Sequence, residues 1–159
     1  MSRIRNGERG FTLVELLAVV AIIAVLGAFI TPNVIRAIEK SRVSGAVADS
    51  RVVKSAVQSY YYDTGQWPTE SIAGTDPGFC TNPGVSGWSG PYLEHWPSVN
   101  PWGGTFTYSS GENQLFGGTV RYLRLSDVPD NALEKLQESL GSSNVKKDSS
   151  YLYILLSKD

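Results

Sequence analysis

Few side chains in this chain of 159 residues could do catalytic chemistry. It has one histidine, His95, and one cysteine, Cys80, so a metal site of several such ligands, an internal disulfide and a hydrolytic triad with a spare histidine are all excluded. We interpret His95 as a surface residue, and Cys80 as a thiol that is either free or joined to another molecule. The sequence therefore predicts no catalytic residue, no metal site, no cofactor and no enzyme.

Carboxylates are more numerous than cations in the middle of the chain. Between Ser55 and Val120 there is no lysine or arginine. The acidic residues of this stretch are Asp63, Glu70, Asp76, Glu94 and Glu112. Oxygen ligands of this kind suit a hard cation, but a cation site needs several of them close together. Their dispersion predicts no such site, and cation binding stays an open question.

The most unusual ionisable residue is Glu15, because it is the one such residue in the apolar run 11–30, FTLVELLAVVAIIAVLGAFI. As a helix this run is long enough to cross the hydrocarbon core of a bilayer. A carboxylate there is costly unless it is protonated or paired, so it indicates a function. The basic residues Arg3, Arg5 and Arg9 precede the run and predict that this end stays in the cytoplasm.

The string GFTLVELL at residues 10–17 resembles the class III signal of the type IV pilin and type II secretion pseudopilin family. The resemblance implies that a membrane prepilin peptidase removes residues 1–10 by cutting between Gly10 and Phe11, and that Phe11 is then N-methylated. The apolar helix would stay on the mature protein. Pro32 also lies where members of that family commonly have a proline. The alternative is an uncleaved signal anchor.

Cleavage would also provide a partner for Glu15. The new amino group of Phe11 would be the one cation near the apolar run. In a bundle of staggered parallel copies, the amino group of a neighbour could pair with Glu15 in apolar surroundings. We therefore assign Glu15 and Phe11 to filament assembly. The alternative is a protonated Glu15 near the membrane interface.

A single long helix is predicted, with residues 11–31 in the membrane or filament core and residues 32–62 continuing into the head. Gly27 and Pro32 are the positions where a bend is expected. The second part shows helical periodicity. Its predicted buried face consists of Ile35, Val43, Ala46, Val47, Val53, Val57, Tyr60 and Tyr61. Of the three consecutive tyrosines from Tyr60 to Tyr62, two are expected in the core and one outside.

Residues 63–159 are expected to form the globular head. A loop over residues 69–103 is rich in glycine, proline, serine and tryptophan, and loops of this length are usually functional or interfacial. Residues 96–108 resemble the proline-tryptophan-glycine motif that precedes the first strand of major pseudopilins and related pilins. We expect this corner to pack against the long helix.

The sequence of the rest of the head predicts a small antiparallel sheet. A hairpin is expected from residues 105–109 and 114–116, followed by a strand at residues 119–125. A capping box of Asn131 and Glu134 predicts the start of a short helix that ends at Gly141.

Residues 151–157, YLYILLS, are apolar at every position but the last and predict a strand that is covered on both faces, by the long helix on one side and the short helix on the other. The fold class is therefore α+β, a long N-terminal membrane-spanning helix that serves as the spine of a small antiparallel β-sheet head. Residues 144–150 contain a single acid, so the calcium-binding tail of many major pseudopilins is not expected.

The function that these features favour is a structural subunit that polymerises into a type IV pilus-like filament. A major pseudopilin of a type II secretion system is the alternative, and a minor pilin acting as an adhesin or DNA receptor is a weaker one. The net charge of −1 predicts no nucleic-acid partner. The acidic stretch could be merely solvated, or it could contact the basic residues 36–54 of an adjacent subunit, which would make assembly sensitive to salt.

The expected partners are other copies of the chain, the prepilin peptidase, the inner-membrane assembly platform with its ATPase, and the membrane itself. The expected location is the bacterial inner membrane, crossed once with the head outside the cytoplasm, and later a periplasmic or extracellular filament.

Overall fold

The computed structural model describes residues 10–158, and of residues 29–32 it describes the backbone alone. The chain forms two compact units, one up to Ile38 and one from Glu39 onward. One helix, α1 (Leu13–Thr64), contributes residues to both units. It ends at Thr64, two residues later than predicted, because Gly65 adopts a left-handed φ of 68° and its amide donates to the carbonyl of Tyr61 at 2.9 Å.

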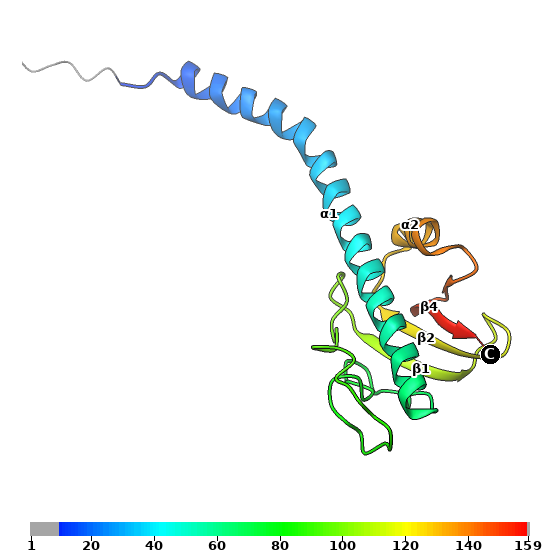
Figure 1. Cartoon of the computed structure of the whole chain (residues 1–159). Coiled ribbons are helices and arrows are strands. Elements are labelled where there is room, and N and C mark those ends of the chain that lie inside the picture. The colour runs from blue at the N-terminus through cyan, green and yellow to red at the C-terminus, as the bar shows by residue number, and fades with distance from the viewer. Residues whose placement is uncertain (1–9, 159) are drawn as a thin grey trace, which may run out of the picture. The chain divides into compact units, whose positions relative to one another are not determined.

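The second unit contains a four-stranded antiparallel sheet with the order β1-β2-β4-β3. Its strands are β1 (Phe106–Glu112), β2 (Thr119–Ser126), β3 (Val145–Lys147) and β4 (Tyr151–Lys158). A short helix, α2 (Asp130–Leu140), lies between β2 and β3 in the sequence. In this unit the C-terminal part of α1 crosses the sheet (Figure 1). The predicted α+β class, with a long apolar N-terminal helix and a small antiparallel sheet, is confirmed.

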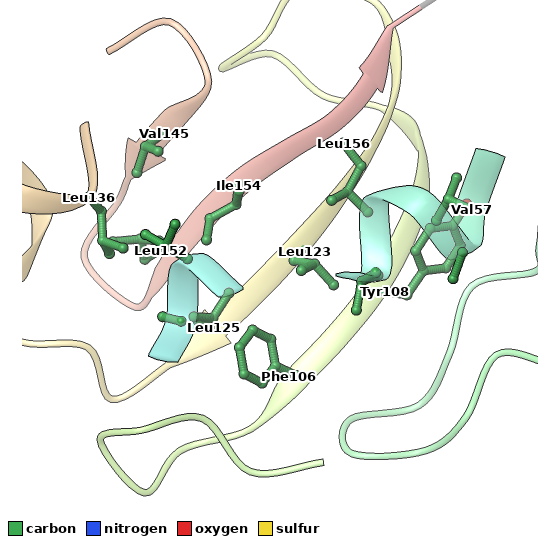
Figure 2. Close-up of a cluster of buried hydrophobic side chains, with 14 of the residues drawn as sticks. Val57, Phe106, Tyr108, Leu123, Leu125, Leu136, Val145, Leu152, Ile154 and Leu156 are labelled. Carbon is green, nitrogen blue, oxygen red and sulfur yellow. The ribbon is translucent and has the colours of Figure 1, made fainter. Parts of the chain in front are cut away.

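The core of the second unit lies on one face of the sheet. Figure 2 shows side chains of β1, β2 and β4 together with Val57 of α1 and Leu136 of α2 in a single cluster. Along β4, Leu152, Ile154 and Leu156 are buried, whereas the alternating residues from Tyr151 to Ser157 are only half-buried. The expectation that β4 is covered on both faces is therefore wrong, because both helices pack on the same face.

The predicted second strand of the hairpin is also wrong. Residues 114–116 form no strand but lie in the turn between β1 and β2, because Gly117 and Gly118 have positive φ angles and the Asn113 amide donates to the Gly118 carbonyl at 3.0 Å. The strand β1 accordingly continues to Glu112.

The capping box expected at the start of α2 is absent. The helix begins at Asp130, with Pro129 at the N-cap position in place of Asn131 and no side-chain cap. The start of α2 is held instead by Lys147 of β3, whose ammonium donates to the Asp130 carboxylate and to the Val128 carbonyl at 2.7 Å. The two residues of this ion pair are seventeen positions apart, so no local sequence pattern indicates it.

Candidate functional site: the start of the long helix and the head that it carries

The first turn of α1 is closed by a reciprocal capping box. The Thr12 amide donates to Glu15 Oε2 at 2.9 Å, and the Thr12 hydroxyl donates to the same oxygen at 2.7 Å. The Glu15 amide in turn donates to Thr12 Oγ1 at 3.2 Å. This pattern satisfies amides that the first helical turn leaves without partners. Thr12 caps α1, a role that our sequence reasoning missed, although the spacing T-x-x-E before an apolar run is a recognised signal for it.

The predicted scissile bond lies immediately before this cap. Gly10 and Phe11 are outside α1, and 77% of Phe11 is exposed. The predicted leader, residues 1–10, lies outside the described residues except for Gly10. Cleavage between Gly10 and Phe11 stays a prediction.

The first part of α1 is apolar and uncovered. From Gly10 to Ala28 every residue is exposed, including Leu16, Ile22 and Leu26, each with more than half of its surface accessible. The helix is long and apolar enough to cross a membrane by length and composition. Apolar surface on this scale marks an interface with lipid or with other protein.

Gly27 and Pro32, the two positions where a bend is expected, both lie within the uninterrupted helix α1. A methyl group on Gly27 would meet nothing within 4 Å in the described chain, so packing gives no reason for glycine there. A bend at Gly27 or Pro32 stays a prediction.

The second part of α1 has a buried face, as the periodicity predicted. Val43, Ala46, Val53 and Val57 are at most 6% exposed. Ile35 does not belong to this face, because it lies in the first unit and is 61% exposed.

The three consecutive tyrosines point in three directions. Tyr60 is buried, Tyr61 is 40% exposed and stacks on Trp67 at 4.0 Å between ring centroids, and Tyr62 is 85% exposed. One of them lies in the core rather than the two expected, because successive helical residues are rotated by about 100°.

The proline-tryptophan-glycine corner packs against α1, as expected. The Trp102 indole N–H donates to the two Glu39 carboxylate oxygens at 3.2 and 3.4 Å, and Glu39 is only 8% exposed. Pro101 lies 3.4 Å from the position that a Cβ on Gly45 would take. Glu39 interrupts the apolar stripe in the sequence. The structure shows that its carboxylate accepts the hydrogen bond that joins the corner to α1.

Asn100 fixes the shape of the corner. Its side-chain oxygen accepts the amides of Trp102 and Gly104 at 2.9 and 3.2 Å, and its side-chain nitrogen donates to the Ser126 carbonyl at 2.7 Å. A Cβ on Gly104 would lie 2.2 Å from that Ser126 carbonyl oxygen, so glycine is needed for this close approach. The corner is thereby joined to the end of β2.

The long loop is held to the head by aromatic packing. Phe79 is fully buried, and its ring centroid lies 6.1 Å from Tyr60, 5.9 Å from Trp96 and 5.8 Å from Tyr108. Its carbonyl accepts the Tyr92 amide at 2.8 Å. Residues 69–103 contain no helix or strand, as predicted, and these contacts replace regular secondary structure.

Three of the five acidic residues between Ser55 and Val120 are engaged within the head. Asp63 accepts hydrogen bonds from the hydroxyls of Ser89 and Tyr92, which lower the pKa of its carboxyl. Glu70 accepts one from Ser109, and Asp76 accepts the backbone amides of Phe79, Cys80 and Thr81. Within residues 10–158 no group of three or more His, Cys, Asp or Glu residues could hold a metal ion.

Glu94 and His95 lie instead beside α1. Together with Asp49, Val52 and Val53 of α1, and with Leu93 and Pro97, they line a cavity of about 270 Å³. Burial raises the pKa of the Asp49 carboxyl, and the nearby His95 imidazole partly opposes that shift. His95 itself is exposed, as predicted.

Cys80 is half-buried and has no disulfide partner in the structure. Burial and the neighbouring Asp76 carboxylate raise the pKa of its thiol. A raised pKa keeps the sulfur protonated at neutral pH, which lowers its reactivity.

Two family models match separate parts of the chain. Residues 5–31 match the model described as the prokaryotic N-terminal methylation motif, and residues 37–120 match the model described as PilW, C-terminal.

Similar proteins are found among secretion and pilus proteins. The chain is 29% identical over 153 residues to the type II secretion system core protein G of Vibrio cholerae, which covers 92% of this chain and 98% of that protein. It is 32% identical over 111 residues to the core protein G of Escherichia coli strain K12, covering 65% and 73% of the two chains. It is 39% identical over 67 residues to the type IV major pilin protein PilE1 of Neisseria gonorrhoeae, covering 42% and 31%.

Proposed function

The chain belongs to the family of type IV pilins and type II secretion pseudopilins, and on that premise we propose that it is a structural subunit which polymerises through α1 into a filament. Before assembly, a prepilin peptidase cuts between Gly10 and Phe11, and the new N-terminus of Phe11 is methylated. The leader of residues 1–10 is then lost, while the apolar helix is kept.

The observation that carries this proposal is that the first part of α1 is apolar in composition and yet exposed. No other described part of the chain covers the apolar side chains from Leu13 to Leu26. Their cover must come from lipid before assembly and from the same helix of other copies afterwards. In that exchange, a platform driven by an ATPase extracts the subunit from the inner membrane.

Glu15 has two successive partners in this scheme. In the unprocessed chain its carboxylate accepts hydrogen bonds from Thr12. In the filament, the Phe11 amino group of a neighbouring copy pairs with Glu15, because an unpaired carboxylate in an apolar core would be strongly unfavourable. The cap keeps the carboxylate satisfied until that partner arrives.

A specific observation favours the type II secretion pseudopilus as the filament that this subunit builds. The similarity to core protein G extends over 153 residues and therefore includes the head, whereas the similarity to the pilin extends over 67. The head determines which neighbours and cargo a filament contacts. We therefore favour secretion over surface attachment, and the head lies outside the cytoplasm in either case.

The test is expression of the full chain in cells that have a type II secretion system whose own core protein G gene is deleted, with and without the prepilin peptidase. We expect filaments, and restored secretion, when the peptidase is present. Filaments without secretion would indicate a pilus subunit. Filaments that form equally well without the peptidase would contradict the proposed processing.

A further inference from the structure

The exposed side of α1 in the second unit has edges of opposite charge. Lys40, Arg51 and Lys54 are exposed and fall, at about 100° per residue, within a sector about 60° wide. Asp49 and Val52 lie on the other edge. Five small, exposed residues lie between the two edges, and they are Ser41, Ser44, Ala48, Ser55 and Ser59. The exposed Tyr62 lies in the same sector near the end of α1. Small residues allow another backbone to approach closely.

The acidic edge opens into the cavity of about 270 Å³ described above, which we call the acidic pocket. Its walls are apolar where Val52, Leu93 and Pro97 line it, and its titratable groups are the Asp49 and Glu94 carboxylates and the His95 imidazole. Neither carboxylate forms an ion pair within residues 10–158. An apolar cavity with carboxylates at its wall suits a lysine or arginine, whose alkyl stem is apolar and whose end is charged.

The basic edge borders a second cavity, of about 220 Å³, which we call the basic pocket. It lies between α1 and the α2–β4 side of the head. Arg51 and Lys54 provide its charge, while Ser139 and Asn144 add polar groups. No carboxylate within the described chain pairs with Arg51 or Lys54, including Glu138, which precedes Ser139 on α2.

Other charged groups are less suited to this contact. Asp63, Glu70 and Asp76 are engaged within the head, and Glu112 lies at the end of β1 and lines neither pocket. Arg42 is on the acidic edge but about two helical turns before Asp49, outside the pocket lining.

We propose that Arg51 and Lys54 of one copy of this chain enter the acidic pocket of the next copy, where they pair with Glu94 and Asp49. The contact rests on the proposed filament function and specifies how adjacent heads meet. It joins two different surfaces of the same molecule, so it is a head-to-tail contact that repeats into an open helical array rather than closing into a dimer. Charge complementarity at this contact sets the register between heads, while the apolar part of α1 provides the core.

The first test is a charge exchange in the full chain, assayed by the yield of sheared filaments. Glu94→Lys and Lys54→Glu should each lower the yield about tenfold or more, since each places like charges at the contact. The double variant, Glu94→Lys with Lys54→Glu, should recover most of the wild-type yield. Glu112→Lys makes the same charge change outside the pocket and should stay within about twofold of wild type. Single variants at the wild-type yield would overturn the proposal.

The second test does not depend on yield. In a Cys80→Ser background, Pro97→Cys labels the rim of the acidic pocket and Ser139→Cys labels the basic pocket. Oxidation of assembled filaments should give a ladder of covalent multimers from the double variant, whereas each single variant should give at most dimers. Normal filaments that yield no ladder would overturn the proposal.

The outcomes also separate this proposal from the proposed function. If the wild-type chain is cleaved, methylated and assembled while the charge variants behave like it, the head contact is wrong and the filament function stands. If the wild-type chain is neither cleaved nor assembled, the filament function is wrong and the head contact falls with it.

Discussion

The two parts of α1 belong to one helix but have opposite surroundings. Up to Ala28 its apolar side chains are exposed throughout, whereas from Val43 onward one face of it is buried against the sheet and the long loop. A globular protein normally buries the apolar stripe of a helix against its own chain. The second part follows that rule. The first part follows it only when lipid or other copies are present.

This difference separates two kinds of stability. The head is stabilised by its own core, so substitutions there should change unfolding of the isolated subunit. Under the proposed function, the first part of α1 is stabilised by lipid or by other copies, so substitutions there should change assembly and leave the head intact. The variants below either break this separation or sharpen it.

The largest effect is expected at Glu15. Glu15→Ala removes the carboxylate that caps α1 and that, in the proposed filament, pairs with the Phe11 amino group of a neighbouring copy. We expect filament yield to fall at least about tenfold, because a buried amino group would be left without its counter-ion. The thermal midpoint of the head, followed by tryptophan fluorescence, should not change. A variant that assembles at the wild-type level would contradict the assembly role.

The converse effect is expected at Phe79. Phe79→Ala removes a fully buried ring from the aromatic cluster, which should lower the free energy of unfolding by about 3–5 kcal/mol. Urea titration of the full chain in detergent measures this. Tyr62→Ala is the matched control, since Tyr62 is 85% exposed and should change the stability by less than about 0.5 kcal/mol. Equal losses in both variants would mean that the loop is not held by this cluster.

A smaller loss is expected at the corner. Trp102→Phe keeps an aromatic side chain, although a smaller one, and removes the indole N–H that donates to the nearly buried Glu39 carboxylate. Leaving that carboxylate without its donor should cost about 1–3 kcal/mol. Adding Glu39→Gln should recover part of the loss, since a neutral amide tolerates burial better than a charge. If Glu39→Gln makes the loss larger, the charge is satisfied in another way.

The smallest effect is expected from titration of Asp49. Burial raises its pKa in the folded state, so charged Asp49 lowers stability above that pKa, and this penalty disappears as the pH falls below the ordinary value of 3.8. Asp49→Asn should therefore raise the thermal midpoint at pH 7 and match wild type at pH 3.

The effect of Asp63 on the pH dependence of stability should have the opposite sign. Hydrogen bonds from Ser89 and Tyr92 lower its pKa, so its contribution to stability is present at pH 7 and is lost as the pH falls through the folded-state pKa. Asp63→Asn should lower the midpoint at pH 7 and have a smaller effect at pH 3. Two variants with the same sign at pH 7 would contradict this assignment.

The sequence was sufficient for the parts of the fold that depend on local patterns. The apolar run and the stripe on α1 predicted the long helix, and the apolar run YLYILLS predicted β4. The Thr12 cap was equally local, and the T-x-x-E spacing could have revealed it.

The remaining features depend on contacts between residues far apart in the sequence. Lys147 reaches Asp130 across seventeen residues, and Trp102 reaches Glu39 across sixty-three. No periodicity records such pairs. The acidic pocket is of the same kind, because Asp49 and Glu94 approach each other only once the long loop has folded against α1.

The most direct test of the central claim is the intact mass of the protein purified from cells with and without the prepilin peptidase. We predict that residues 1–10 are lost and one methyl group is gained when the peptidase is present, and that the full-length, unmethylated chain is recovered when it is absent. A full-length, unmethylated chain in both strains would contradict the account, because α1 would then begin behind an uncleaved leader with no free Phe11 amino group to pair with Glu15.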